Sequence, residues 1–371
     1  MPTPTVQPGR VAIVHDYLTQ RGGAERAVLA MTKALPGVPV YTSLFEPAST
    51  FPEFRSLDVR TGPVDRVGFL RRHHRMAFPL LAPAFSLLRV DAQVLLCSSS
   101  GWAHGTGGSG AKVVYCYTPA RWLYQPQRYL GTSRRPFARA ALATLAPALR
   151  RWDRASAATA GRYLAISTVV RDRIRTCYGI DAEILHPPSL LGAAGPRAQV
   201  SGLSGGHLLC VSRLLPYKNV SLLVSAMAAL PGHQLVIVGT GPDEPVLRAS
   251  APPNVRLMGT VDDDSLRWLY ASCSAVVAPS YEDFGLVPIE AASFGKPTVA
   301  LRGGGFLDTV VEGQTGLFFD LAEREAVVAG IRQVAQVNWS ETAIRGAAER
   351  FGEERFGQRL SEIVAEESRR L

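Results

Sequence analysis

Residues 274–290 read SAVVAPSYEDFGLVPIE, an apolar run followed by a polar segment and a second apolar run. The first run, SAVVAPS, is typical of a buried strand, and the second predicts a helix that begins near Leu286. A strand followed directly by a helix is the repeating unit of a parallel sheet covered on both faces. Such sheets bind ligands at the carboxyl ends of their strands, so Glu282 and Glu290 become candidate site residues.

The same alternation of strand and helix runs through both halves of the chain. It predicts an α/β fold with two doubly wound, Rossmann-like domains. Strands are predicted at 11–17, 38–44, 92–100, 111–117, 162–168 and 182–187, and then at 207–212, 234–239, 254–259, 274–280 and 296–301, with helices at 219–230, 264–272 and 286–294 in the second half.

A segment rich in glycine and serine separates the two halves. Residues 191–206, LGAAGPRAQVSGLSGG, show little hydrophobic pattern and predict a linker. The predicted domains are therefore residues 1–190 and residues 207–351. The last helical stretch, about 352–371, is expected to cross back and pack on the N-terminal domain.

The composition indicates a globular chain with anionic partners. Of 371 residues, 47% are hydrophobic and 19% are charged, and the net charge is +9. No helix-turn-helix, RNP or zinc pattern accompanies the charge, so we do not expect nucleic-acid binding. The five cysteines are far apart without C-x-x-C pairing, which predicts free thiols in a reducing compartment. Without a signal-peptide core or an apolar run long enough to span a bilayer, we expect a cytoplasmic protein.

The second half carries candidate groups for a diphosphate and for neighbouring hydroxyls. In VSRLLPYKN (211–219), Arg213 and Lys218 lie between a strand and a helix, where two cations and free N–H groups suit a diphosphate. The alternative is a pair of surface cations. Glu290 can accept two hydrogen bonds from neighbouring sugar or ribose hydroxyls, and the N–H groups of Gly285 and Leu286 can face a phosphate.

Two glycine-rich segments of the second half allow different interpretations. RGGGFLD (302–308) predicts either a nest of N–H groups close to an anion or a flexible loop. GTGPDEP (239–245) lacks the third glycine of a dinucleotide fingerprint, because Glu244 stands there, so a helix-capping turn is the preferred interpretation.

The first half offers polar groups at its own strand ends. Gly22 and Gly23 allow a phosphate or sugar to approach the backbone. CSSSGWAHG (97–105) brings together three hydroxyls and His104, and CYTPARWLY (116–124) places Arg121 among aromatic residues that could stack on a sugar.

Two basic and apolar stretches suggest contact with an anionic membrane surface. Residues 67–90 interleave Phe69, Phe78 and Phe85 with a run of basic side chains, RRHHR (71–75), and residues 133–154 repeat this character. The alternative is two solvated helix faces.

Taken together, these motifs resemble the family 4 retaining glycosyltransferases of the GT-B fold. The resemblance rests on EDFGLVPIE (282–290), EAASFGKPTVA (290–300), GGGFLDTVVEGQTGLFF (303–319), VSRLLPYKN (211–219) and RGGAER (21–26). CSSSGWAHG, CYTPARWLY and PPS (187–189) resemble a mannosyltransferase-like subgroup that acts in polysaccharide or O-antigen assembly.

The resemblance implies two domains that face a central cleft and bind a nucleotide-sugar donor, a GDP- or UDP-hexose with GDP-mannose preferred, without a metal or other cofactor. It implies retention of the anomeric configuration and a glycan or polyprenyl-linked acceptor. The implied catalytic residues are Glu282, His104, Arg213 and Lys218. The implied donor-binding residues are Arg213 and Lys218 at the diphosphate, Glu290 at the ribose, Glu282, Phe284, Gly285 and Leu286 at the sugar and phosphate, Met258 and Gly259 at the base, and Gly22 and Gly23 closing on the diphosphate. The implied acceptor or sugar contacts are Ser99, Ser100, Arg121 and Trp122.

This sequence departs from the family pattern at two positions. Many relatives have a histidine directly after the strand that ends at Cys97, where this chain has serines and His104 follows several residues later. Relatives of the subgroup often have a histidine where this chain has Tyr117. Both departures concern the acceptor and the sugar-specific contacts and leave the donor diphosphate site intact. Two other functions also stay open at this point, a nucleotide-sugar epimerase that transfers nothing and a catalytically silent sugar-nucleotide-binding partner.

Overall fold

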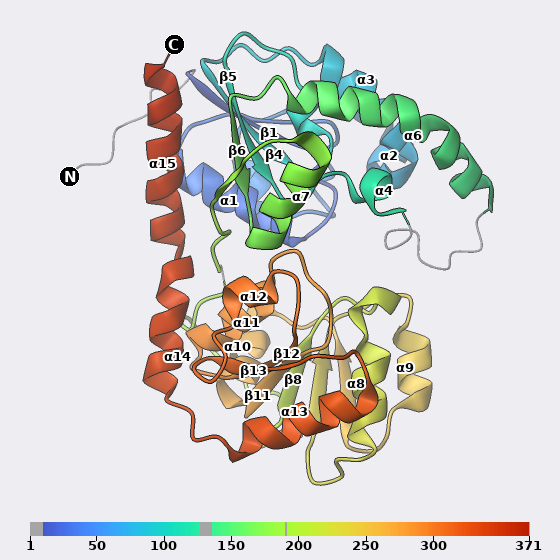
Figure 1. The fold of residues 1–371 in the computed structure, drawn as a ribbon, viewed down its shortest axis with the longest axis vertical. Coiled ribbons are helices and arrows are strands. Elements are labelled where there is room, and N and C mark those ends of the chain that lie inside the picture. Colours follow the sequence, from blue (N-terminus) through green and yellow to red (C-terminus); the bar gives the residue numbers. More distant parts are fainter. Residues whose placement is uncertain (1–9, 127–135, 190, 371) are drawn as a thin grey trace. The chain divides into compact units, whose positions relative to one another are not determined.

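The computed structural model of the chain describes residues 10–126, 136–189 and 191–370. It divides into two compact units (Figure 1). The first unit contains the residues up to Pro188 together with Glu353–Leu371, and the second contains Ser189–Gly352. Each unit is built on its own parallel sheet, which confirms the predicted α/β fold.

The sheet of the first unit has the strand order β3-β2-β1-β4-β5-β6-β7, with every pair parallel. Its order reverses between β1 and β4, which is the switch point of a doubly wound sheet. The strands are β1 (Val11–His15), β2 (Val40–Thr42), β3 (Val59–Thr61), β4 (Val94–Ser99), β5 (Ala111–Cys116), β6 (Arg162–Ala165) and β7 (Glu183–Ile184).

Helices cover both faces of this sheet, and the last of them comes from the far end of the sequence. They are α1 (Gly23–Ala34), α2 (Gly68–Arg72), α3 (Phe78–Leu87), α4 (Arg121–Tyr124), α6 (Pro136–Ala157), α7 (Thr168–Tyr178) and α15 (Glu353–Arg369). Helix α15 packs beside α1, where the Ser361 hydroxyl donates to the Ala34 carbonyl at 3.3 Å (Figure 1). Arg162 on β6 also pairs with Glu366 of α15 at 2.6 Å.

The sheet of the second unit has the order β10-β9-β8-β11-β12-β13, again all parallel, and reverses between β8 and β11. Its strands are β8 (Leu208–Val211), β9 (Leu235–Val238), β10 (Val255–Gly259), β11 (Ala275–Ala278), β12 (Thr298–Leu301) and β13 (Gly316–Phe319). Its helices are α8 (Val220–Met227), α9 (Glu244–Ser250), α10 (Asp263–Ser272), α11 (Leu286–Ser293), α12 (Phe306–Thr309), α13 (Arg324–Gln336) and α14 (Glu341–Ala348).

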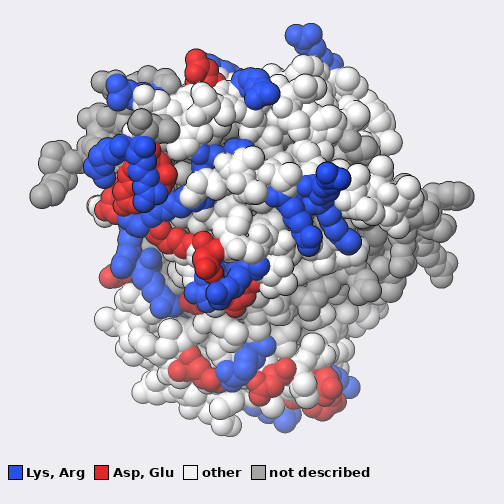
Figure 2. All heavy atoms as spheres, turned by 45° about the horizontal axis from the view of Figure 1, so that its top comes forward, with Lys and Arg blue, Asp and Glu red and all other residues white. Residues whose placement is uncertain are grey.

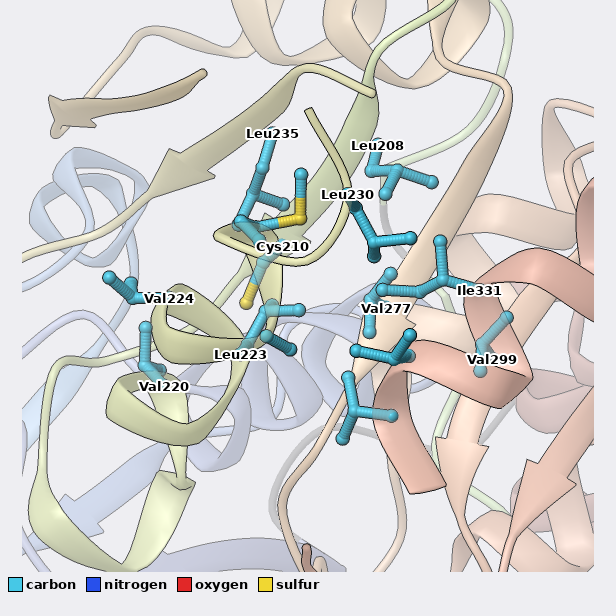
Figure 3. Close-up of a cluster of buried hydrophobic side chains, with 14 of the residues drawn as sticks. Leu208, Cys210, Val220, Leu223, Val224, Leu230, Leu235, Val277, Val299 and Ile331 are labelled. Atoms are coloured by element: carbon cyan, nitrogen blue, oxygen red, sulfur yellow. The ribbon is translucent and has the colours of Figure 1, made fainter. Parts of the chain in front are cut away.

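Alternate side chains of these strands point to opposite faces of the sheet and form two hydrophobic cores, one on each face. On one face, Leu208, Cys210 and Val277 pack against Leu223 of α8 and Ile331 of α13 (Figure 3). The other face packs against α10 and α11. The buried side chains there include Leu191, Val200 and Leu203, so the segment 191–206, predicted as a linker, has no helix or strand but packs on the second unit.

Two strands were not predicted from the sequence. β3 has a single apolar residue and lies at the sheet edge, and β13 follows a glycine-rich turn that interrupts its apolar pattern. Helix α14 belongs to the second unit and α15, in the predicted final stretch, to the first, with Gly352 between them.

Candidate active site

The switch point of the second unit brings together two of the predicted site residues. Lys218 follows β8 and Glu282 follows β11, and these neighbouring strands end at the same edge of the sheet. The Lys218 ammonium donates to Oε1 of Glu282, and Ser280 Oγ donates to the same oxygen at 2.6 Å. The side chains of Lys218 and Glu282 are 11% and 22% exposed, so the pair is shielded but reaches solvent.

A second cation lies in the same loop as Lys218. Arg213 is exposed, and its guanidinium donates to the Tyr217 hydroxyl at 3.1 Å. The Lys218 ammonium lies 5.1 Å from the centre of the Tyr217 ring. Tyr217 therefore contacts both predicted diphosphate ligands, although nothing in its own sequence context pointed to it.

The N-terminus of α8 begins directly after these cations and has no side-chain cap. Asn219 occupies the N-cap position, but its side-chain amide donates to the Pro279 carbonyl at 3.0 Å. The first N–H groups of a helix have no partner within the helix and favour an anion. The loop thus combines two cations with an uncapped helix end.

Helix α11 carries the other predicted donor groups. Gly285 is its N-cap with φ 98, and a Cβ there would lie 2.5 Å from the Phe306 ring, so the turn requires glycine. Glu290 lies one turn into the helix, and its Oε2 accepts from the Tyr270 hydroxyl at 2.7 Å. The Phe284 side chain is buried against Phe351, which leaves only its backbone to meet a ligand.

The three glycines of RGGGFLD pack closely on another segment of the backbone and do not form an open anion nest. The Gly305 N–H donates to the Glu282 carbonyl at 2.9 Å, and a Cβ on Gly304 would lie 2.2 Å from that same carbonyl oxygen. Arg302 is exposed and pairs with Glu312 and Asp320. The close approach predicted from the glycines is therefore to the loop that carries Glu282, which it holds in place.

Met258 and Gly259 are the last two residues of β10, at the carboxyl ends of the strands of the same sheet. Gly259 has φ 70, and its carbonyl accepts from the Gly239 N–H at 2.8 Å. Both residues are half-buried, and the Met258 side chain packs partly on the second core. Their predicted contact with a base stays a prediction.

In the first unit, Asp16 organises the loop after β4. It follows β1 directly, and its carboxylate accepts from the N–H groups of Ser100, Trp102 and Ala103 at 2.6, 3.2 and 2.7 Å. Burial raises the pKa of Asp16 to about 6, although these N–H groups favour the ionised form. Sequence analysis missed Asp16, whose signal was its place at the end of a buried strand.

The structure gives His104 and Ser99 internal partners. Ser99 Oγ lies 3.0 Å from Nδ1 of His104, and Nε2 of His104 lies 3.0 Å from the buried Asp153 carboxylate. Ser99 and His104 are 1% and 2% exposed. Within its unit His104 therefore has the surroundings of a structural histidine, and we withdraw it and Ser99 from the groups that touch a substrate.

Trp122 and Arg121 differ in their surroundings. Trp122 is buried, and its ring stacks on that of Trp102 with centroids 4.5 Å apart, so it has no free face for a sugar within this unit. Arg121 is half-buried at the start of α4, and Ser100 is half-buried with its N–H bound to Asp16. Arg121 and Ser100 remain candidates for acceptor or sugar contacts.

Gly22 and Gly23 begin α1 and are held by a chain of hydrogen bonds. Tyr117, at the position where a histidine was expected, donates to the Ala24 carbonyl at 3.0 Å. Ser98 Oγ lies 2.9 Å from the Tyr117 hydroxyl and 2.9 Å from Nδ1 of His15. Since the carbonyl only accepts, Ser98 donates to Tyr117 and His15 donates from Nδ1. Burial lowers the pKa of His15 to about 4, which keeps this ring neutral.

Glu25 lies beneath the same turn. Its side chain is 1% exposed, and Oε1 accepts from Gln20 at 3.1 Å. Oε2 is buried without a hydrogen-bond partner in the described part of the chain, and a Cβ on Gly22 would lie 2.6 Å from it. Burial raises the pKa of Glu25 to about 7.

Metal-type clusters and membrane-spanning helices are both absent from the part of the chain that the structure describes. Among them, His, Cys, Asp and Glu side chains form no group of three or more that could hold a metal ion. None of the helices in the described ranges combines the length and the apolar character needed to cross a bilayer.

Part of the chain is similar in sequence to known glycosyltransferases. The family model of the "Glycosyl transferases group 1" matches residues 203–351. A glycogen synthase from Thermus thermophilus is 31% identical over 174 residues, which cover 45% of this chain and 40% of that protein. The lipopolysaccharide core biosynthesis mannosyltransferase LpcC from Rhizobium leguminosarum is 29% identical over 207 residues, or 50% of this chain and 57% of that protein. The matches thus span less than two thirds of these curated relatives.

A solved structure extends the likeness of fold to both units. Anabaena Alr3699/HepE, solved in complex with UDP and glucose, has a TM-score of 0.70 at 17% identity and covers 96% of this chain and 99% of that one. Over residues 203–351 the chain therefore matches the group 1 glycosyl transferases, and its two α/β units have the GT-B fold of glycosyltransferase structures.

Proposed function

We propose that this protein is a retaining glycosyltransferase that moves a hexose from a nucleotide sugar to a glycan or lipid-linked acceptor in polysaccharide or cell-envelope glycan synthesis. GDP-mannose is the first candidate donor, which the resemblance to LpcC favours. A UDP-hexose is the second, because the HepE structure holds UDP and glucose.

The contact between Lys218 and Glu282 carries this proposal. It joins a cation and a carboxylate at the switch point of the second unit, beside the uncapped end of α8. When the bond between the sugar and the diphosphate breaks, negative charge develops on the leaving diphosphate. Preorganised cations and N–H groups stabilise that charge most when little water surrounds them. In the proposed function Lys218, Arg213 and α8 supply this stabilisation.

The two acids then have separate roles. Oε1 of Glu282 is occupied by Lys218 and Ser280, so Oε2 is the oxygen offered to a hydroxyl of the donor sugar. Glu290 keeps its orientation through Tyr270 and accepts from the ribose hydroxyls. The contacts of Gly22 and Gly23 with the diphosphate stay a prediction.

A thermal-shift panel tests the donor site. GDP, UDP and ADP are compared with their common sugar nucleotides, each with and without EDTA. A ligand that binds only the folded protein raises the melting temperature in proportion to RT ln(1 + [L]/Kd). We expect a clear rise with GDP or GDP-mannose that EDTA leaves unchanged. No rise with any of the nucleotides would contradict the proposed donor site.

Product analysis separates transfer from the two other functions. Incubation of the bound donor with oligosaccharide and polyprenyl-linked acceptors, followed by proton NMR of the anomeric signals, is expected to show a new linkage with the donor's configuration. An epimerase would convert the nucleotide sugar without any acceptor. A silent partner would bind the donor and leave it intact under both conditions.

Replacement of Lys218 by alanine is expected to weaken nucleotide-diphosphate binding at least about tenfold, because a charge-assisted contact to a phosphate is lost. Isothermal titration calorimetry measures this effect. Lys296→Ala is the matched control. Lys296 also pairs with a glutamate, Glu341, but it precedes β12 and so lies at the amino ends of the strands, away from the proposed site. Equal affinity in the two variants would remove Lys218 from the donor site.

We also propose that part of the first unit docks on an anionic membrane surface to reach a lipid-linked acceptor. The docking surface consists of exposed apolar side chains with exposed arginines among them. They are Val67, Phe69, Met76, Leu80, Leu87 and Leu145, with Arg66, Arg72 and Arg89. On the face viewed in Figure 2, basic side chains lie partly beside acidic ones and partly among uncharged atoms.

Of the three phenylalanines predicted to contact a membrane, Phe69 alone is exposed. Phe69 is 50% exposed, whereas Phe85 is buried and the Phe78 ring packs against that of Trp102. Arg71 donates to the Asp65 carbonyl at 2.8 Å and is half-buried. The side chains of His74 and Arg75, and much of the stretch 133–154, lie outside the described residues.

The double variant Phe69→Ser/Met76→Ser is expected to reduce binding to anionic vesicles about tenfold, because two side chains that would enter the interface are lost. Co-sedimentation with vesicles of phosphatidylglycerol and phosphatidylcholine measures it. Val246→Ser, at an apolar residue of the second unit that is 69% exposed, serves as the control. Wild-type protein that sediments equally with anionic and neutral vesicles, or with neither, would contradict docking.

A further inference from the structure

Asn219 has a backbone conformation that needs an explanation. With φ 55 and ψ 25 it is left-handed, and no other non-glycine residue of the described chain has a positive φ. Asparagine tolerates this region better than most residues, but the conformation persists only where surrounding contacts hold it. Such residues concentrate at functional sites, and Asn219 lies directly after Lys218.

The Asn219 side chain connects two loops that are distant in sequence. An N-cap side chain normally accepts from an N–H of the first helical turn. Asn219 instead donates from Nδ2 to the carbonyl of Pro279 at 3.0 Å and makes no cap bond to α8. The loop after β8 is thereby tied to the loop after β11.

The contact between Lys218 and Glu282 joins the same two loops as this hydrogen bond. Lys218 precedes Asn219 by one residue, and Glu282 follows Pro279 by three. Ser280, next to Pro279, fixes Oε1 of Glu282 at 2.6 Å. The two loops are therefore joined by one ionic contact and one neutral hydrogen bond. A bound donor would compete for the ionic contact, because Lys218 would also face the diphosphate, whereas it would leave the neutral bond intact.

We propose that Asn219 is a positioning residue that clamps the two donor-site loops and so holds Lys218 against Glu282 while the diphosphate leaves. The inference rests on the proposed function and adds a residue to it. Asn219 itself touches no donor atom; it acts through the placement of its neighbours.

Substitutions at Asn219 distinguish the effect of its backbone conformation from the effect of its hydrogen bond to Pro279. Asn219→Gly keeps the left-handed conformation at no steric cost and loses the bond to Pro279. Asn219→Asp keeps the size of the side chain, but a carboxylate has no hydrogen to donate to a carbonyl. We expect both variants to lower kcat about five- to tenfold, the effect of one lost hydrogen bond. The nucleotide-diphosphate Kd should change less than about threefold in Asn219→Gly, whereas the negative charge that Asn219→Asp adds beside Lys218 also weakens diphosphate binding. Asn219→Ala adds backbone strain and should be the most impaired of the three.

Asn254→Ala is the control for a purely structural asparagine. Asn254 donates from Nδ2 to the carbonyls of Met227, Leu230 and His233 at 3.1, 3.0 and 2.9 Å, around the turn between α8 and β9. Its loss should lower the melting temperature and leave the kcat of the folded enzyme unchanged.

The measurements are kcat, donor KM, nucleotide Kd and melting temperature for wild type and the four variants. A fall in kcat for both Asn219→Gly and Asn219→Asp, with a nearly unchanged Kd in Asn219→Gly, supports the clamp. Wild-type kcat in Asn219→Gly, or a loss that only follows its melting temperature as in Asn254→Ala, overturns it. A wild-type protein that binds no nucleotide diphosphate would instead overturn the proposed function, and this inference with it.

Discussion

Glu282→Gln is expected to lower kcat roughly 100-fold while the nucleotide-diphosphate Kd changes only a few-fold. Removal of one preorganised electrostatic contact at a reacting centre typically has an effect of this size. The glutamine keeps the shape of the side chain, but its neutral amide can no longer balance the Lys218 ammonium, which it contacts through Oε1 in the wild type. The donor would still bind through its diphosphate and ribose.

Steady-state kinetics with the donor identified by the thermal-shift panel measures this effect. Glu341→Gln is the matched control, because Glu341 also pairs with a lysine, Lys296, which lies at the amino ends of the strands. Its kcat should equal that of wild type. Glu282→Asp restores the charge on a shorter side chain and should recover part of the activity. Equal kcat for Glu282→Gln and Glu341→Gln would show that Glu282 takes no part in turnover.

The second large effect is a dependence of stability on pH that originates at Glu25. Burial raises the pKa of its carboxyl group to about 7 from its usual value of about 4.5. Between these values the folded protein holds a proton that the unfolded chain has released. Stability therefore falls as pH rises from about 4.5 to 7, by up to about 3 kcal/mol from this group, and stays low above pH 7.

Glu25→Gln should remove this contribution, because the amide is neutral at every pH. The variant is expected to melt at a higher temperature than wild type at pH 8 and at about the same temperature at pH 4.5. Two other buried groups change protonation in this range, Asp16 with its pKa raised to about 6 and His15 with its pKa lowered to about 4. Both are present in wild type and variant, so the difference between the two melting curves reports Glu25 together with its electrostatic interaction with Asp16.

Melting temperatures recorded from pH 4.5 to pH 8 measure this difference. Glu53→Gln, at an exposed glutamate of the same unit, is the control and should follow wild type throughout. If the Glu25→Gln curve also runs parallel to that of wild type, Glu25 is ionised in the folded protein and its burial costs less than we infer.

The alternation of strands and helices was predictable because burial on both faces of a parallel sheet leaves a local signature. Runs such as those of β8 and β11 are continuously apolar over four residues. β13 and β3 were missed because a glycine-rich turn and an edge position weaken that signature. The burial of Leu191 and Val200 was missed for a related reason, since isolated apolar residues in a glycine-rich segment do not show a period.

For the candidate site too, features that depend on local sequence were predictable and contacts between distant residues were not. Local sequence patterns were enough to place Arg213, Lys218 and Glu282 after strand ends and Glu290 inside a helix, because strand and helix periods are local properties. The contacts between distant segments appear only in the folded chain, where Lys218 meets Glu282, Asn219 reaches Pro279, and the glycines after Arg302 pack on the Glu282 loop. The burial of His104 and Trp122 against internal partners likewise appears only there. These contacts join residues up to 64 positions apart, and their formation depends on strand order and side-chain packing, which no local pattern records.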